Sequence, residues 1–287
     1  MSSEHWYNTA GEACHTQPTK SKGAKNPTRP TTIADAKKLG LLPSVSSILK
    51  QAANPALDRW KAQQIIKACF NCQPIGDEDF ETYSKHILEK ADKERDEAAS
   101  LGTAIHAAIE GYYTGKPRDK FLDQYVLPAV ETVESLGIKI VDQEFVVASS
   151  HGYAGTTDLA FTHESFCGIL DFKSTKTTPE EPVLIKQGHA AQIAAYHVAY
   201  WSNDNPINNN SKGYNVYIST TEPGRITVVP YDAATLRREF EYFLNCFGLW
   251  KHRYNYDPRT AFTEVAGQAE EADRQGGAES GATGFTD

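Results

Sequence analysis

The hydrophobic residues of this chain change their spacing near residue 137, and that change limits the folds open to it. Before this point, apolar side chains recur at helical intervals, as in Phe80, Tyr83, Ile87 and Ala91. After it, short apolar runs at 157–162 and 166–172 are separated by a polar connection, which is typical of antiparallel strands. Helical spacing returns at 187–201 and 232–254, with a hairpin pattern between them. This order predicts an α/β fold with a mixed central sheet flanked by helices.

The helices expected in the front half fall between recognisable start and stop signals. Asn54-Pro55 fits a capping residue followed by proline at the first helical position, and Gly137 fits a helix stop. The expected helices are 45–52, 55–72, 77–99, 101–112 and 121–136. The strands expected after them are 138–148, 157–162, 166–172, 214–219 and 225–229.

Composition divides the chain into three parts. Residues 1–38 are polar and rich in Thr, Lys, Pro and Gly, which predicts a flexible or loosely docked arm. Residues 39–263 are expected to form one domain. Residues 264–287 carry six acids and one base, and we expect a disordered acidic tail. The tail accounts for most of the net charge of −8, so the remainder is close to neutral and can still carry a local basic groove.

Several classes of protein are excluded or disfavoured. No apolar run has the length of a membrane span, and the first residues do not resemble a secretory signal. The five cysteines are odd in number and scattered, which favours a reducing cytoplasm over a disulfide scaffold. Cys69 and Cys72 have no second ligand pair nearby, so a zinc site is not expected.

The most informative residues are carboxylates at the ends of two expected strands. Asp171 and Lys173 are two residues apart in a strand, so their side chains share a face. If the two strands pair, Asp158 can join them, and carboxylates are suitable ligands for Mg²⁺ or Mn²⁺. The alternative is that Asp171 and Lys173 form an ordinary surface ion pair at a strand edge.

Two helical pairs accompany these acids. His106 and Glu110 are four residues apart and share a helix face, with Gly102 one turn earlier. Gln192 and Tyr196 have the same spacing on the helix after the Asp-x-Lys strand. Taken alone, His106 also fits a core or capping histidine, and Tyr196 fits a side chain packed on the sheet.

In their order along the chain, these features resemble the motif series of RecB-type nucleases in the PD-(D/E)XK superfamily. The series consists of Gly102-x₃-His106-x₃-Glu110, Gly155-x₂-Asp158, Asp171-x-Lys173-Ser174 and Gln192-x₃-Tyr196. Upstream, residues 43–49 and 57–61 are similar to a segment of the mitochondrial genome maintenance exonuclease family and its stand-alone bacterial and phage relatives. The resemblance spans about residues 42–200.

The resemblance implies a restriction-endonuclease-like core and a role for each matching residue. His106, Asp158 and Asp171 would bind Mg²⁺ or Mn²⁺, Lys173 would be the catalytic lysine, and Glu110 would support the helix or the metal. Gln192, Tyr196 and Ser174 would contact DNA. Residues 54–99 would form a helical cover over the site, where Arg59 and Lys61 would contact phosphates and Trp60 would stack on bases or anchor the helix.

The expected function is that of a metal-dependent DNA exonuclease acting on single-stranded ends in replication, recombination or repair. The expected partners are DNA and the proteins of replication or recombination. The alternative is a catalytically silent nuclease-fold module that binds nucleic acid or a protein. The intact set of Asp158, Asp171 and Lys173 favours the enzyme. Some relatives hold an iron–sulfur cluster with one early and three late cysteines, but here only Cys246 is late, so no iron–sulfur cluster is expected.

Overall fold

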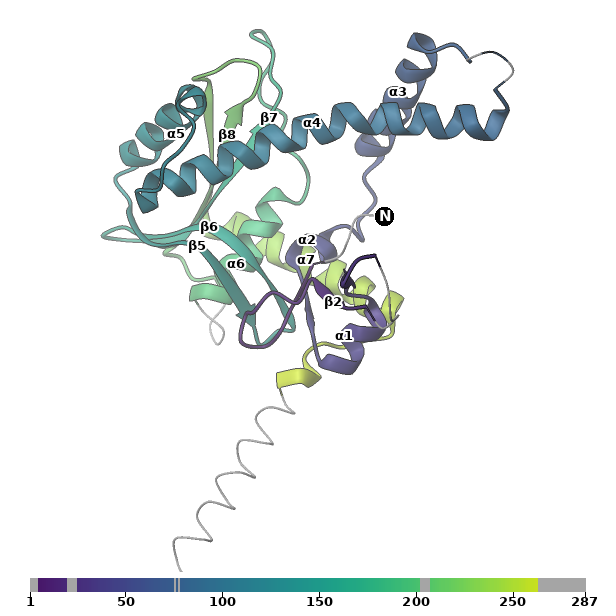
Figure 1. Cartoon of the computed structure of the whole chain (residues 1–287). Helices are drawn as coiled ribbons and strands as arrows, with labels where there is room; N and C mark the ends of the chain where they lie inside the picture. Colours follow the sequence, from purple (N-terminus) through teal and green to yellow (C-terminus); the bar gives the residue numbers. More distant parts are fainter. Residues whose placement is uncertain (1–4, 20–24, 75, 77, 202–206, 263–287) are drawn as a thin grey trace, which may run out of the picture.

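A five-stranded sheet with the order β5-β6-β7-β8-β9 forms the centre of the computed structural model (Figure 1). The strands are β5 (Lys139–Ser149), β6 (Tyr153–Thr162), β7 (Cys167–Thr175), β8 (Ser211–Ser219) and β9 (Ile226–Tyr231). Neighbouring strands are antiparallel except β7 and β8, which are parallel and joined through helix α6 (His189–Trp201). The predicted α/β fold with a mixed sheet is confirmed. The structure describes residues 5–19, 25–74, 76, 78–201 and 207–262.

Helices cover both faces of the sheet and create two separate cores. On one face, Ile105 and Val126 from α4 (Phe80–Thr114) and α5 (Asp123–Ser135) pack with Phe172 of β7. On the other, Ile193 of α6 and Phe243 of α7 (Ala233–Tyr254) pack with Ile169 of β7. The side chains of β7 alternate between the two cores. Polar side chains are therefore expected on this strand beyond the apolar packing, at the strand end.

Helix α4 is one continuous helix of 35 residues, whereas the sequence predicts two helices, 77–99 and 101–112. The predicted break is wrong because the residues between them contain no proline, and a single glycine inside a helix costs only about 1 kcal/mol relative to alanine. The helix ends at Thr114, close to the predicted end at 112, and Gly115 follows in the left-handed conformation (φ 68°).

Helix α3 (Pro55–Asn71) and the first half of α4 form a helical hairpin that projects beyond the edge of the sheet (Figure 1). A small core of its own joins the two helices, formed by Ala68, Cys72, Ile87 and Ala91 with Tyr83 beside them. This hairpin occupies the segment for which a helical cover is predicted. It is preceded by α2 (Val45–Leu49), which packs on α6 and α7.

The N-terminal segment differs from the predicted loose arm. It contains β1 (Trp6–Tyr7), β2 (Thr16–Pro18), β3 (Thr28–Pro30) and α1 (Ile33–Leu39), and β1 pairs with β4 (Leu42–Pro43). Trp6 is fully buried and its ring meets that of Trp250 edge-on, with centroids 6.0 Å apart. The periodicity of so short a strand cannot be seen among polar neighbours. The predicted acidic tail, 264–287, lies outside the described residues.

Across the described residues, no helix is both long enough and apolar enough to cross a membrane.

Candidate active site

The candidate site lies where β6 and β7 separate. The ladder between these strands pairs Leu159 with Leu170 and goes no further in this direction. Beyond this pair, the Asp158 carboxylate replaces a strand as the hydrogen-bond acceptor. Its Oδ2 accepts a hydrogen bond of 2.6 Å from the backbone N–H of Phe172. Asp158 therefore satisfies a backbone donor that has no partner strand, and its side chain is fixed beside the backbone that carries Asp171.

Asp171 and Lys173 form a close pair at this strand end. The Lys173 Nζ lies 2.6 Å from the Asp171 Oδ2, and the Asp171 side chain is only 6% exposed. The same Nζ donates to Gln192 Oε1 of α6 at 2.9 Å. This burial excludes the alternative of an ordinary surface ion pair, because the carboxylate is removed from solvent and the ammonium is held from two elements.

Tyr196 continues this chain of contacts into the core. The Gln192 Nε2 donates to the Tyr196 hydroxyl at 3.3 Å. Tyr196 is only 3% exposed, and a Cβ on Gly155 would lie 2.8 Å from its hydroxyl oxygen. The side chain therefore packs against the glycine of β6 and holds Gln192, and its contact with DNA stays a prediction.

His106 approaches the carboxylates from α4, on the opposite side of the sheet. Its Nδ1 lies 3.7 Å from the Asp158 Oδ2, and its ring meets the Phe172 ring edge-on. One turn earlier, Gly102 lies so close to Ser174 that a Cβ on the glycine would collide with the serine Oγ. The absence of a side chain at Gly102 thus lets α4 come near enough for His106 to reach Asp158.

The buried charges at this site shift one another's pKa values. Burial raises the pKa of Asp171 to about 6, with Asp158 adding to the shift and the Lys173 ammonium opposing it. Burial acts the same way on Asp158, but its contact with His106 outweighs this and lowers the pKa. Burial would lower the pKa of His106, yet the Asp158 carboxylate reverses the shift and raises it. His106 and Asp158 therefore stabilise each other in their charged forms.

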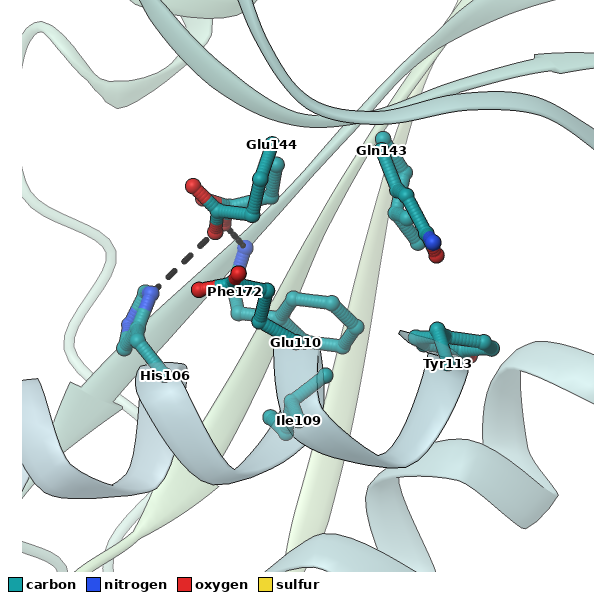
Figure 2. Close-up of a pocket in the computed structure, with 9 residues that line it drawn as sticks. His106, Ile109, Glu110, Tyr113, Gln143, Glu144 and Phe172 are labelled. Carbon is teal, nitrogen blue, oxygen red and sulfur yellow. Dashed lines mark hydrogen bonds and ion pairs between the residues drawn. The ribbon is translucent and has the colours of Figure 1, made fainter. Parts of the chain in front are cut away.

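A pocket opens beside His106 and Asp158 (Figure 2). Its polar lining includes two further acids, Glu110 of α4 and Glu144 of β5. Glu110 also accepts a salt bridge of 2.7 Å from Lys116. The remaining lining residues are Ile109, Tyr113, Gln143, Leu159 and Phe172.

Glu144 is the pocket residue that the sequence reasoning missed. It is exposed at the surface, but its carboxyl group loses hydration beside Asp158 and Glu110, which raises its pKa to about 7. Its φ of 45° is unusual for a residue within a strand. The β5–β6 ladder pairs Gln143 with Leu159 and Phe145 with Thr157, so Glu144 lies opposite Asp158. Only this register could have placed Glu144 at the site from the sequence. Using it requires knowing that the expected strands 138–148 and 157–162 pair.

The remaining predicted residues are not all brought to the pocket. Ser174 lies against Gly102, at the edge of the site. Arg59 and Lys61 are exposed on α3, in the projecting hairpin, and do not line the pocket.

The carboxylate oxygens and the imidazole nitrogen at this site are suitable ligands for a hard divalent cation. In the described residues they do not already form a complete coordination shell. Within the described residues, no three His, Cys, Asp or Glu side chains form a ready-made metal site. Asp171 is instead neutralised by the Lys173 ammonium, and Asp158 by His106 and a backbone N–H. Two carboxylates and an imidazole are nevertheless the oxygen and nitrogen donors that Mg²⁺ and Mn²⁺ accept.

Comparison with known proteins adds little to this geometry. No protein-family model and no curated protein matches the sequence. Among solved structures, the chain is similar to the crystal structure of SSO0001, with 14% sequence identity and a TM-score of 0.28. That match covers 67% of this chain and 86% of SSO0001.

Proposed function

We propose that this protein is a divalent-metal-dependent DNA exonuclease with a restriction-endonuclease-like core, of the RecB type within the PD-(D/E)XK superfamily. One observation carries the proposal. Asp158, Asp171, Lys173 and His106 come from three elements, yet they meet at the single point where β6 and β7 part. Chance surface charges would not share buried contacts with one another and with Gln192.

Each residue then has a defined task. Asp158, Asp171 and His106 would hold Mg²⁺ or Mn²⁺, which supplies Lewis-acid activation of water and of the scissile phosphate. Lys173 would stabilise the negative charge that develops on the phosphate oxygens, since its Nζ is held in place by Asp171 and Gln192. Phe172 contributes its backbone N–H to Asp158, which keeps that carboxylate turned toward His106. The hairpin of α3 and α4 would receive the DNA strand, with Arg59 and Lys61 near phosphates.

The test is digestion of end-labelled single- and double-stranded linear DNA with Mg²⁺, with Mn²⁺ and with EDTA. We expect metal-dependent release of short products from single strands and little action on blunt duplex. Asp171→Ala, purified in parallel, is the control for contaminating nucleases and should be inactive. Binding of DNA by the parental protein without cleavage under either metal would refute the nuclease and favour a silent binding module.

A further inference from the structure

Asn215 is a buried polar residue at the centre of β8, where apolar side chains would be expected. It is fully shielded from solvent, between β7 and β9. Asparagine is rare in strand interiors, and burying its amide is unfavourable unless every polar atom finds a partner. The partners of this side chain therefore indicate why the sheet contains it.

The Asn215 amide nitrogen is bonded to Asp171. The two residues are direct neighbours in the parallel β7–β8 ladder. The Asn215 Nδ2 donates to the Asp171 Oδ2 at 3.1 Å and to the Asp171 backbone oxygen at 3.4 Å. The Lys173 Nζ contacts the same carboxylate oxygen. The amide hydrogen bond and the ion pair therefore both fall on Oδ2.

Tyr231 fixes which way the amide points. Its hydroxyl donates to the Asn215 Oδ1 at 2.9 Å, from β9. A carboxylate can only accept hydrogen bonds, so the amide nitrogen must face Asp171 and the amide oxygen must face a donor. Tyr231, at 7% exposure, supplies that donor from within the core. The chain Tyr231–Asn215–Asp171 therefore has one consistent direction of donation.

We propose that Asn215 and Tyr231 are positioning residues for the metal-binding carboxylate Asp171, an inference that rests on the proposed function. By holding Oδ2, they would keep the carboxylate in one orientation for a cation. Groups that orient a ligand in this way typically change metal affinity or activity by about 10- to 100-fold when removed. Neither residue lines the pocket, so their effect on the site would be exerted through Asp171.

The test measures the binding of Mn²⁺ alone, by titration calorimetry without DNA, to the full chain. Tyr231→Phe removes only the hydroxyl, and Asn215→Leu replaces the amide with an apolar side chain of similar size. We expect the Kd for Mn²⁺ to rise by about 10-fold or more in both. Tyr214→Phe is the matched control: Tyr214 is equally buried on β8 but belongs to the opposite core, and its variant should keep the parental Kd.

Thermal melting without metal separates positioning from folding. If Asn215→Leu does not fold, Tyr231→Phe decides the matter, because losing one hydroxyl leaves the packing intact. A parental Kd in folded Tyr231→Phe and Asn215→Leu would overturn the inference and leave the nuclease proposal standing. Equal loss of Mn²⁺ affinity in Tyr214→Phe would also overturn it. Failure of the parental protein to bind Mn²⁺ would overturn both proposals.

Discussion

Gly102 of α4 and Ser174 of β7 are in contact without room for a methyl group between them: a Cβ on the glycine would collide with the serine Oγ. This contact determines how closely α4 approaches the end of β7. His106 lies one helical turn further along, so its distance to Asp158 depends on the same approach.

Gly102→Leu should therefore impair the site. Ser174 can rotate away from a methyl group but not from a branched side chain, so α4 must move outward and carry His106 with it. We expect cleavage to fall by about 100-fold, as for displacements near 1 Å in other active sites, measured as the initial rate on a labelled single strand.

Gly248→Leu is the control for that substitution, because nothing lies within 4 Å of the space for its Cβ and the position is an exposed part of α7. Leucine there should stabilise the helix by about 0.5–1 kcal/mol and leave cleavage unchanged. Parental activity in Gly102→Leu would mean that the close approach of α4 is not needed.

Lys173→Ala should abolish most cleavage while DNA binding is kept. Removing one positioned charge donor typically lowers kcat by about 100- to 1000-fold. DNA affinity should change little, because one lysine contributes a small part of the phosphate contacts. Single-turnover cleavage and a binding titration measure the two effects separately. Lys176→Ala, on the exposed segment just beyond β7, is the matched control and should cut at the parental rate.

The stability of the metal-free protein should depend on Glu144 above neutral pH. Its pKa is raised from 4.5 to about 7, chiefly because the carboxyl group loses hydration in the pocket, so the folded state favours the protonated carboxyl. That stabilising contribution is complete below about pH 4.5 and is lost as the pH rises through about 7. Glu144→Gln mimics the protonated form at every pH. In EDTA, it should melt at the parental temperature at pH 4 and above it at pH 8; the reverse order would contradict the assigned shift.

Trp6→Ala should unfold the protein at markedly lower denaturant concentration. Trp6 is fully buried against Trp250, and deleting a core tryptophan typically costs about 3–5 kcal/mol. Urea unfolding followed by circular dichroism measures this loss. Phe70→Ala is the comparison, since Phe70 is 86% exposed on α3, and its removal should change the free energy of unfolding by less than about 0.5 kcal/mol. Equal stability of Trp6→Ala and the parent would mean that the N-terminal segment is only loosely attached.

A linear single strand should be degraded and its covalently closed circle should resist. The reason is the proposed use of the α3–α4 hairpin to receive a strand by its free end, which a circle lacks. A time course on both forms, with identical metal and salt, makes the comparison. Cutting of both at the same rate would show endonuclease action in an open groove.

The sequence was sufficient to predict the sheet and the residues that follow its period. Asp171 and Lys173 share a face in any strand, and Asp158 lies at the start of a recognisable apolar run, so their meeting needs only the pairing of two neighbouring strands. Lys173 contacts Gln192 because α6, the helix that follows β7 in the chain, packs back on the same sheet. Local pattern and short connections carry this information.

Other parts depend on contacts between distant segments, which local pattern does not contain. Tyr196 of α6 is buried because Gly155 of β6 leaves room for its ring. Glu144 reaches the pocket because its backbone adopts an unusual φ angle at the position opposite Asp158. Asn215 reads as an isolated polar residue until β7, β8 and β9 are aligned. Trp6 finds its partner Trp250 some 240 residues away along the chain.

Helix α4 joins the projecting hairpin to His106 without interruption, over about 40 Å at 1.5 Å per residue. A continuous helix of this kind is stiff, and the contact of Gly102 with Ser174 holds it against β7. His106 lies one turn beyond that contact, so a tilt of α4 would change the distance from His106 to Asp158. Under the proposed function, a strand bound to the hairpin and the histidine beside Asp158 would be coupled through this single helix.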